Sequence, residues 1–225
     1  IETPREEATR FGVMGVDTDM RIHAFREKPA DPDPIPGKPD RALASMGFYI
    51  FDTDALVRAL IADARADTSR DFGKNIIPDL VAANAPVYAF PFHEPGAPGR
   101  NYWRDIGTLD SFYDANMDLI REDPPFDLYG ADWPIRTHYQ PLPPAKVVDT
   151  EGHAARVENA LLSPGAQVRG ATVRNSVLSP NVVVRPGAVV EDSLLFDDVT
   201  VESNARVSKA IVDKLVRVPA GDRIG

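Results

Sequence analysis

The sequence predicts a mixed α/β domain followed by a left-handed parallel β-helix of hexapeptide repeats. Three observations support this fold class. Strand and helix signals alternate over the first 120 residues, a proline-rich stretch then interrupts every periodicity, and aliphatic residues finally recur at every sixth position. We place the boundaries at residues 1–121 for the α/β part, 122–146 for the connector and 147–225 for the β-helix.

The first part begins with a predicted hairpin over residues 11–28, where apolar residues lie on both sides of an Asp-Thr-Asp turn. Residues 29–40 are predicted to form a loop because their prolines lack backbone donors. The apolar run 47–51 is expected to be a strand that passes into a helix capped near Asp52. One face of that helix is marked by Leu56, Leu60, Ile61 and Ala64.

Two more helices and a strand complete this part. Pro78 suits the first turn of one helix, and Thr108 is the expected N-cap of another. Residues 87–92 are expected to form a strand between them.

The last part contains the repeat. Leu162 and Val168 show the six-residue step in one phase, and Val212, Val218 and Ile224 resume it after a one-residue slip. The unbroken series is Val177, Val183, Val189, Leu195, Val201 and Val207. Each side of a triangular β-helix coil places one such residue in the core, and we prefer this interpretation to a sandwich of short antiparallel strands.

Composition excludes several classes of function. The chain has 25 basic and 34 acidic residues, a net charge of -9, and no basic run, so we expect neither a nucleic-acid nor a membrane partner. The absence of cysteine excludes disulfides and thiolate metal sites. No apolar run approaches the ~20 residues of a membrane span, and we expect a cytoplasmic protein. The four histidines lack ligand spacing and receive no role.

Glu27 and Lys28 form the first candidate site, at the end of the second hairpin strand and before Pro29. A lysine there can meet a phosphate as a point charge, and the glutamate can accept hydrogen bonds from sugar hydroxyls. A solvated pair of charges on an edge strand remains the alternative.

Each of three further residues has two interpretations. Ser45 can bond a hydroxyl or a phosphate oxygen, or it can cap a turn. Gly12, inside a strand pattern, indicates either the close approach of a ligand or a β-bulge. Asp105 is a candidate Mg²⁺ ligand, because Mg²⁺ binds one or two carboxylates together with phosphate oxygens, or it is an acid stabilised near a helix N-terminus.

Taken together and in order, several motifs resemble the glucose-1-phosphate adenylyltransferases, the ADP-glucose pyrophosphorylases of glycogen and α-glucan synthesis. The resemblance covers essentially the whole chain. The motifs are Phe11-Gly12-Val13-Met14, Phe25-Arg26-Glu27-Lys28-Pro29, Ala44-Ser45-Met46-Gly47, Asp71-Phe72-Gly73-Lys74, Tyr102 to Thr108, and Trp133-Pro134-Ile135-Arg136-Thr137.

The resemblance implies an incomplete Rossmann-like nucleotidyltransferase domain and a role for each candidate residue. Gly12, Glu27, Lys28 and Ser45 would contact glucose 1-phosphate, with Lys28 as the catalytic residue that holds the attacking phosphate. Asp105 would bind Mg²⁺. ATP and glucose 1-phosphate would be the substrates, ADP-glucose and diphosphate the products, and the assembly a homotetramer.

The family's Gly-rich phosphate loop and adenine-binding residues do not occur in this sequence, which opens at Ile1 on mid-domain sequence. We therefore expect a nucleotide-binding half before Ile1 and expect the chain alone to be inactive. Two alternatives stay open, a non-catalytic regulatory or assembly subunit and a transferase for another sugar nucleotide such as GDP-mannose.

Overall fold

The computed structural model describes residues 1–93, 101–131, 134–137 and 140–225, so Trp133 of the last motif lies outside the described residues. Their contacts divide the chain into two compact units, Ile1–Trp103 and Arg104–Gly225. Within the described ranges, no helix is both long enough and apolar enough to cross a membrane.

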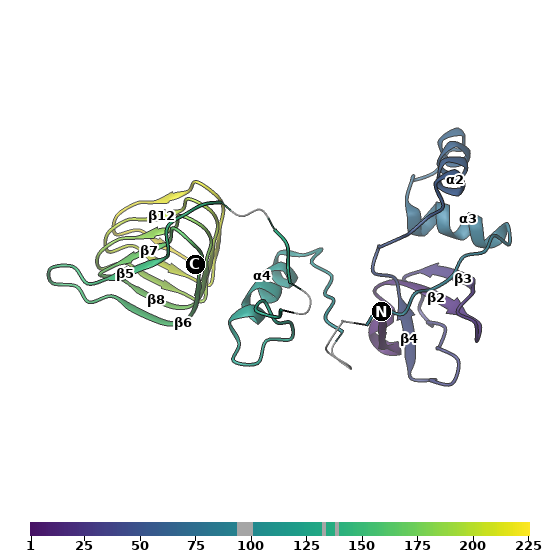
Figure 1. Cartoon of the computed structure of the whole chain (residues 1–225), viewed down its shortest axis with the longest axis horizontal. Helices are drawn as coiled ribbons and strands as arrows, with labels where there is room; N and C mark the ends of the chain where they lie inside the picture. The colour runs from purple at the N-terminus through teal and green to yellow at the C-terminus, as the bar shows by residue number, and fades with distance from the viewer. Residues whose placement is uncertain (94–100, 132–133, 138–139) are drawn as a thin grey trace. The chain divides into compact units, whose positions relative to one another are not determined.

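The first unit is built on a four-stranded antiparallel sheet in the order β1-β4-β2-β3 (Figure 1). The predicted hairpin is confirmed, because β2 and β3 pair from Gly12 opposite Glu27 to Val16 opposite Ile22. Buried apolar residues on these strands form the core of the unit. The strands are β1 (Glu2–Pro4), β2 (Gly12–Val16), β3 (Ile22–Glu27) and β4 (Arg41–Ala44).

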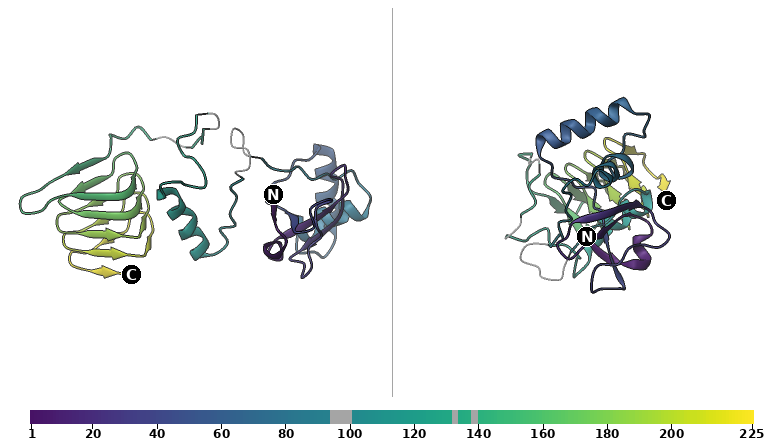
Figure 2. Two further views of the ribbon diagram at one scale, coloured as in Figure 1. Left: turned by 90° about the horizontal axis from the view of Figure 1, so that it is seen from below. Right: turned by 90° about the vertical axis from the view of Figure 1, so that its right-hand side faces the viewer.

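Helices α1 (Arg5–Ala8), α2 (Thr53–Arg65), η1 (Phe72–Ile76) and α3 (Ile77–Ala82) accompany this sheet (Figure 2). The predicted cap of α2 is confirmed, since the Asp52 side chain accepts a hydrogen bond from the backbone N–H of Ala55 at 3.1 Å. Proline occupies the first turn of α3, also as predicted.

Two predicted strands were wrong. The run 47–51 is irregular, with Gly47 at φ +74° and Ile50 fully exposed, and the strand before α2 is instead β4. Residues 87–92 form only an isolated bridge between Tyr88 and Arg21. Apolar, β-branched and aromatic composition favours extended backbone, but a strand also needs a neighbour to pair with. Residues 47–51 have none within the described ranges, and residues 87–92 meet the chain beside Arg21 over a single bridge.

The second unit is a parallel β-helix (Figure 1). Strands from successive coils pair in parallel along its faces, as Val189 does with Thr172 on one side and Arg206 on the other. The strands are β5 (Lys146–Val148), β6 (Arg156–Leu162), β7 (Gln167–Arg169), β8 (Thr172–Leu178), β9 (Val183–Val184), β10 (Val189–Glu191), β11 (Leu194–Leu195), β12 (Thr200–Val201), β13 (Arg206–Ser208), β14 (Ile211–Val212), β15 (Arg217–Val218) and β16 (Arg223–Ile224).

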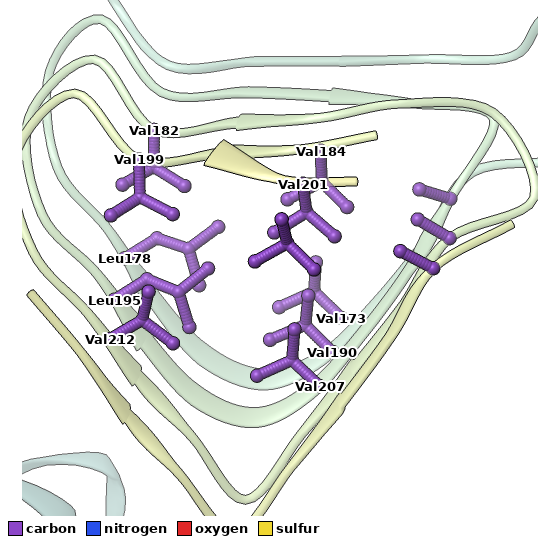
Figure 3. Close-up of a cluster of buried hydrophobic side chains, with 14 of the residues drawn as sticks. Val173, Leu178, Val182, Val184, Val190, Leu195, Val199, Val201, Val207 and Val212 are labelled. Carbon is purple, nitrogen blue, oxygen red and sulfur yellow. The ribbon is translucent and has the colours of Figure 1, made fainter. Parts of the chain in front are cut away.

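The core of the β-helix consists of stacked aliphatic columns (Figure 3). One column is Val173, Val190 and Val207, aligned by parallel pairing of their strands. A second joins Leu178 to Leu195 and Val212. The third contains Val168, Val184, Val201 and Val218.

The β-helix repeat was therefore predicted correctly, but some of the residues assigned to its core were wrong by one position. Leu195, Val201 and Val207 are buried as expected, but Val177, Val183 and Val189 are only half-buried and stand one position away from the core residues. Coils advance by 17 residues, as from Thr172 to Val189 to Arg206, so the core positions step by five, six and six residues. Three steps of six make 18 residues, so a strict step of six shifts by one position relative to the core in every coil.

Helix α4 (Leu109–Met117) and the short helix η2 (Asp118–Ile120) belong to the β-helix unit. Thr108 caps α4 as predicted, in a capping box with Ser111. The rings of Phe112 and Phe196 lie 6.1 Å apart, and the Tyr113 hydroxyl donates a hydrogen bond to the Asp192 carbonyl oxygen at 2.6 Å.

The corrected phase predicts that neighbouring valines differ sharply in their effect on stability. Val190→Ala removes two buried methyl groups from a core column and should lower the free energy of unfolding by about 2 to 3 kcal/mol. Val189→Ala, its matched control on the outer side of the same strand, should cost less than about 1 kcal/mol. Denaturant unfolding followed by circular dichroism measures both, and equal losses would contradict the assigned phase.

Tyr113 predicts an alkaline dependence of stability. Burial, and then the charges of Asp192 and Asp114, raise the pKa of its phenol above the ordinary value. The folded unit thus holds this proton more tightly than the unfolded chain, and its hydrogen bond stabilises fully below about pH 10. Above that pH the advantage of the wild type over Tyr113→Phe should shrink. Thermal unfolding of both proteins from pH 8 to 11 tests this, and a constant difference would contradict it.

Candidate functional site

Four predicted residues lie at one end of the first unit's sheet. Gly12 begins β2 and pairs with Glu27, the last residue of β3. Ser45 follows β4 directly and donates its backbone N–H to the Gly12 carbonyl oxygen at 2.7 Å. The backbone N–H of Lys28 reaches the carbonyl oxygen of Phe11 at 2.9 Å. Antiparallel pairing thus joins residues that are far apart in the sequence.

Gly12 is needed for room and not for a bulge. A Cβ built on it would lie 2.9 Å from Cζ of Phe25 and 3.0 Å from Oε2 of Glu27, so these two side chains would have to move to admit it. The irregularity in the β2–β3 pairing falls between Gly15 and Val16 instead. Gly12 therefore permits the Glu27 carboxylate to lie across the strand end.

Lys28 has an unusual backbone. Its φ is +47°, in the left-handed region that costs a non-glycine residue about 1 to 2 kcal/mol. It also precedes Pro29, which disfavours helical backbone for the residue before it. Both Glu27 and Lys28 are exposed, and within the described ranges no ion pair engages either side chain. Such local strain next to free charges is typical of a functional position.

The structure adds neighbours that had no assigned role. The Ser45 hydroxyl lies 3.4 Å from the Tyr49 hydroxyl, and the Tyr49 ring stacks on Phe72 at 5.5 Å. A Cβ built on Gly73 would lie 3.6 Å from Oε2 of Glu27. Of these neighbours, Phe72 and Gly73 belong to the motif at residues 71–74 noted in the sequence, and Tyr49 belongs to none. Their position beside Glu27 and Ser45 depends on tertiary packing, so the sequence did not predict it.

Asp105 belongs to the other unit and is exposed. Its Oδ1 accepts a hydrogen bond from the backbone N–H of Gly107 at 3.2 Å. The N-cap of the following helix is Thr108 and not Asp105. Within the described ranges, no three His, Cys, Asp or Glu residues gather as a metal site. One exposed carboxylate fits a Mg²⁺ ion shared with phosphate oxygens and water, and does not fit a complete protein cage.

Comparison with known proteins gives two family matches. The profile described as "Nucleotidyl transferase" matches residues 1–122, more than half of the chain. The profile described as "GlmU-like, C-terminal hexapeptide" matches residues 143–225, in agreement with the β-helix. The first match ends at residue 122, just after η2, so it includes α4, which packs on the β-helix.

Curated relatives align over the whole chain. It is 47% identical to "Glucose-1-phosphate adenylyltransferase 2" of Alkalilimnicola ehrlichii, covering 100% of this chain and 53% of that protein. It is 46% identical to the protein of that name from Vibrio cholerae and 44% identical to "Glucose-1-phosphate adenylyltransferase" of Nitrosomonas europaea, covering 56% and 53% of them. The chain spans about half the length of these relatives. It belongs to the nucleotidyl transferase family.

Proposed function

We propose that the protein is a glucose-1-phosphate adenylyltransferase, which transfers an adenylyl group from ATP to glucose 1-phosphate, and that this chain contributes its sugar-phosphate site. The observation that supports this best is the convergence of Gly12, Glu27, Lys28 and Ser45 on one end of a sheet. The names of the curated relatives support the choice of nucleotide and sugar.

Each residue at the sheet end has a chemical task in this proposal. Lys28 holds the phosphate of glucose 1-phosphate with its exposed ammonium group. Glu27 accepts hydrogen bonds from sugar hydroxyls, and Ser45 together with Tyr49 supplies hydroxyl groups beside them. Phe72 stacks on Tyr49 and so restricts how that ring can turn.

The proposed reaction is an in-line displacement. A phosphate oxygen of glucose 1-phosphate bonds to the α-phosphorus of ATP, the bond from that phosphorus to the bridging oxygen breaks, and diphosphate leaves. The protein contributes positioning and charge neutralisation more than covalent chemistry. Asp105 would hold Mg²⁺, which when bound reduces the repulsion between the two phosphate-bearing substrates.

We further propose a homo-oligomer, a tetramer as the resemblance implies, in the cytoplasm. The β-helix supports this, because within the described residues the strands β5 and β6 of its first coil each pair on one side only. Unpaired strand edges favour packing against another surface. Light scattering that finds a monomer at micromolar concentration would contradict the oligomer.

Lys28 gives the test of the proposed site. In the full-length protein, Lys28→Ala should raise the KM for glucose 1-phosphate by about 10² with a smaller change in kcat, because the lost ammonium group binds the substrate. Lys28→Gly should raise KM equally while unfolding no more easily than Lys28→Ala, since glycine tolerates the positive φ. Diphosphate release and thermal unfolding measure the two effects.

The matched control is Lys38→Ala, which removes an exposed lysine of the same unit that pairs with Glu2 at 2.7 Å. Its KM should equal that of the wild type. An unchanged KM in both Lys28 variants would contradict the assigned role. A preference for another sugar phosphate or nucleotide in a substrate panel, GDP-mannose formation included, would contradict the proposed reaction.

A further inference from the structure

The loop that bears Asp105 is attached to the β-helix. Helix α4 follows this loop directly and packs on β8 and β11, and η2 lies against β6 and β8. The Phe112–Phe196 contact and the hydrogen bond from Tyr113 to the Asp192 carbonyl hold α4 in place. The carboxylate proposed to bind the metal therefore stands on the β-helix unit, although the nucleotidyl transferase profile includes it.

An ion pair between the exposed Arg104 and the buried Asp118 lies at the near end of the same loop. Nη2 of Arg104 lies 3.0 Å from Oδ2 of Asp118, whose residue is only 8% exposed. Arg121 lies 3.4 Å from the other carboxylate oxygen. A carboxylate buried to this degree needs a cationic partner, and the Arg104 side chain, itself 36% exposed, supplies one.

These contacts leave very little free chain around Asp105. Arg104 is fixed by Asp118 on one side, and Thr108 is fixed by its capping box with Ser111 on the other. Only residues 105–107 lie between, and within them the Gly107 N–H bonds to the Asp105 carboxylate at 3.2 Å.

We propose that Arg104 and Asp118 are positioning residues, which fix the direction in which the β-helix unit presents Asp105 to the metal–nucleotide complex. The inference rests on the proposed function. Mg²⁺ and Mn²⁺ sites demand that ligand oxygens lie close to ideal positions, so a loosened loop weakens metal binding without any change in the ligand itself.

Four variants test the role of the ion pair. Arg104→Gln removes the loop's tie but leaves Asp118 paired with Arg121, so the buried carboxylate keeps a cation. Arg121→Gln is the matched control, because it removes the other cation and does not touch the loop. Arg104→Lys restores the charge, and Asp105→Asn removes the proposed ligand.

The experiment measures two quantities on the full-length protein without glucose 1-phosphate, so that no turnover occurs. Hydrogen exchange of the amides of residues 105–107 reports the tie, and electron paramagnetic resonance reports the affinity for Mn²⁺–ATP. We expect Arg104→Gln to speed this exchange and to weaken Mn²⁺–ATP by about tenfold. Arg121→Gln should resemble the wild type, and Arg104→Lys should recover part of the loss.

The proposal would be overturned if the amides of residues 105–107 exchanged in Arg104→Gln at the wild-type rate. It would also be overturned if Arg104→Gln and Arg121→Gln changed the exchange rate and the Mn²⁺–ATP affinity equally. Faster exchange with unchanged Mn²⁺–ATP affinity would overturn it as well, and Asp105→Asn then locates the failure. If Asp105→Asn also leaves the affinity unchanged, the proposed metal role is wrong. If Asp105→Asn weakens it, Asp105 binds the metal without help from Arg104.

Discussion

Main-chain pairing of β2 with strands on both sides is the constraint on which the candidate site depends. Its first residue, Gly12, is opposite Glu27 on β3, and its carbonyl receives the N–H of Ser45 beyond β4. These hydrogen bonds place Glu27 and Ser45 on either side of Gly12, each one strand spacing from it. A one-residue slip would send alternate side chains to the other face of the sheet and separate the site.

In the β-helix, main-chain pairing between strands aligns core residues. Parallel pairing between coils stacks Val173, Val190 and Val207 in one column of a buried aliphatic core. Each coil packs on the next. Helix α4 in turn packs on the β-helix through Phe112 and Tyr113. Elements assigned to one family profile can thus belong physically to the neighbouring domain.

The sequence predicted local structure best where a few residues dictate it. Asp52 and Thr108 cap their helices because each side chain accepts a hydrogen bond from a backbone N–H only three positions away. Long-range pairing was harder to foresee. The run 47–51 has a strand's composition but pairs with no strand in the part of the chain that the structure describes. The shift from Val189 to Val190 in the core follows from the 17-residue coil.

By itself the sequence determined the two-part architecture, the hairpin, the helix caps and the repeat, since all of these follow from local chemistry or regular spacing. Only the tertiary structure decided that Tyr49 and Phe72 stack beside Ser45, and that Asp118 holds Arg104. Those contacts join segments whose separation in the chain carries no period, and packing alone brings them together.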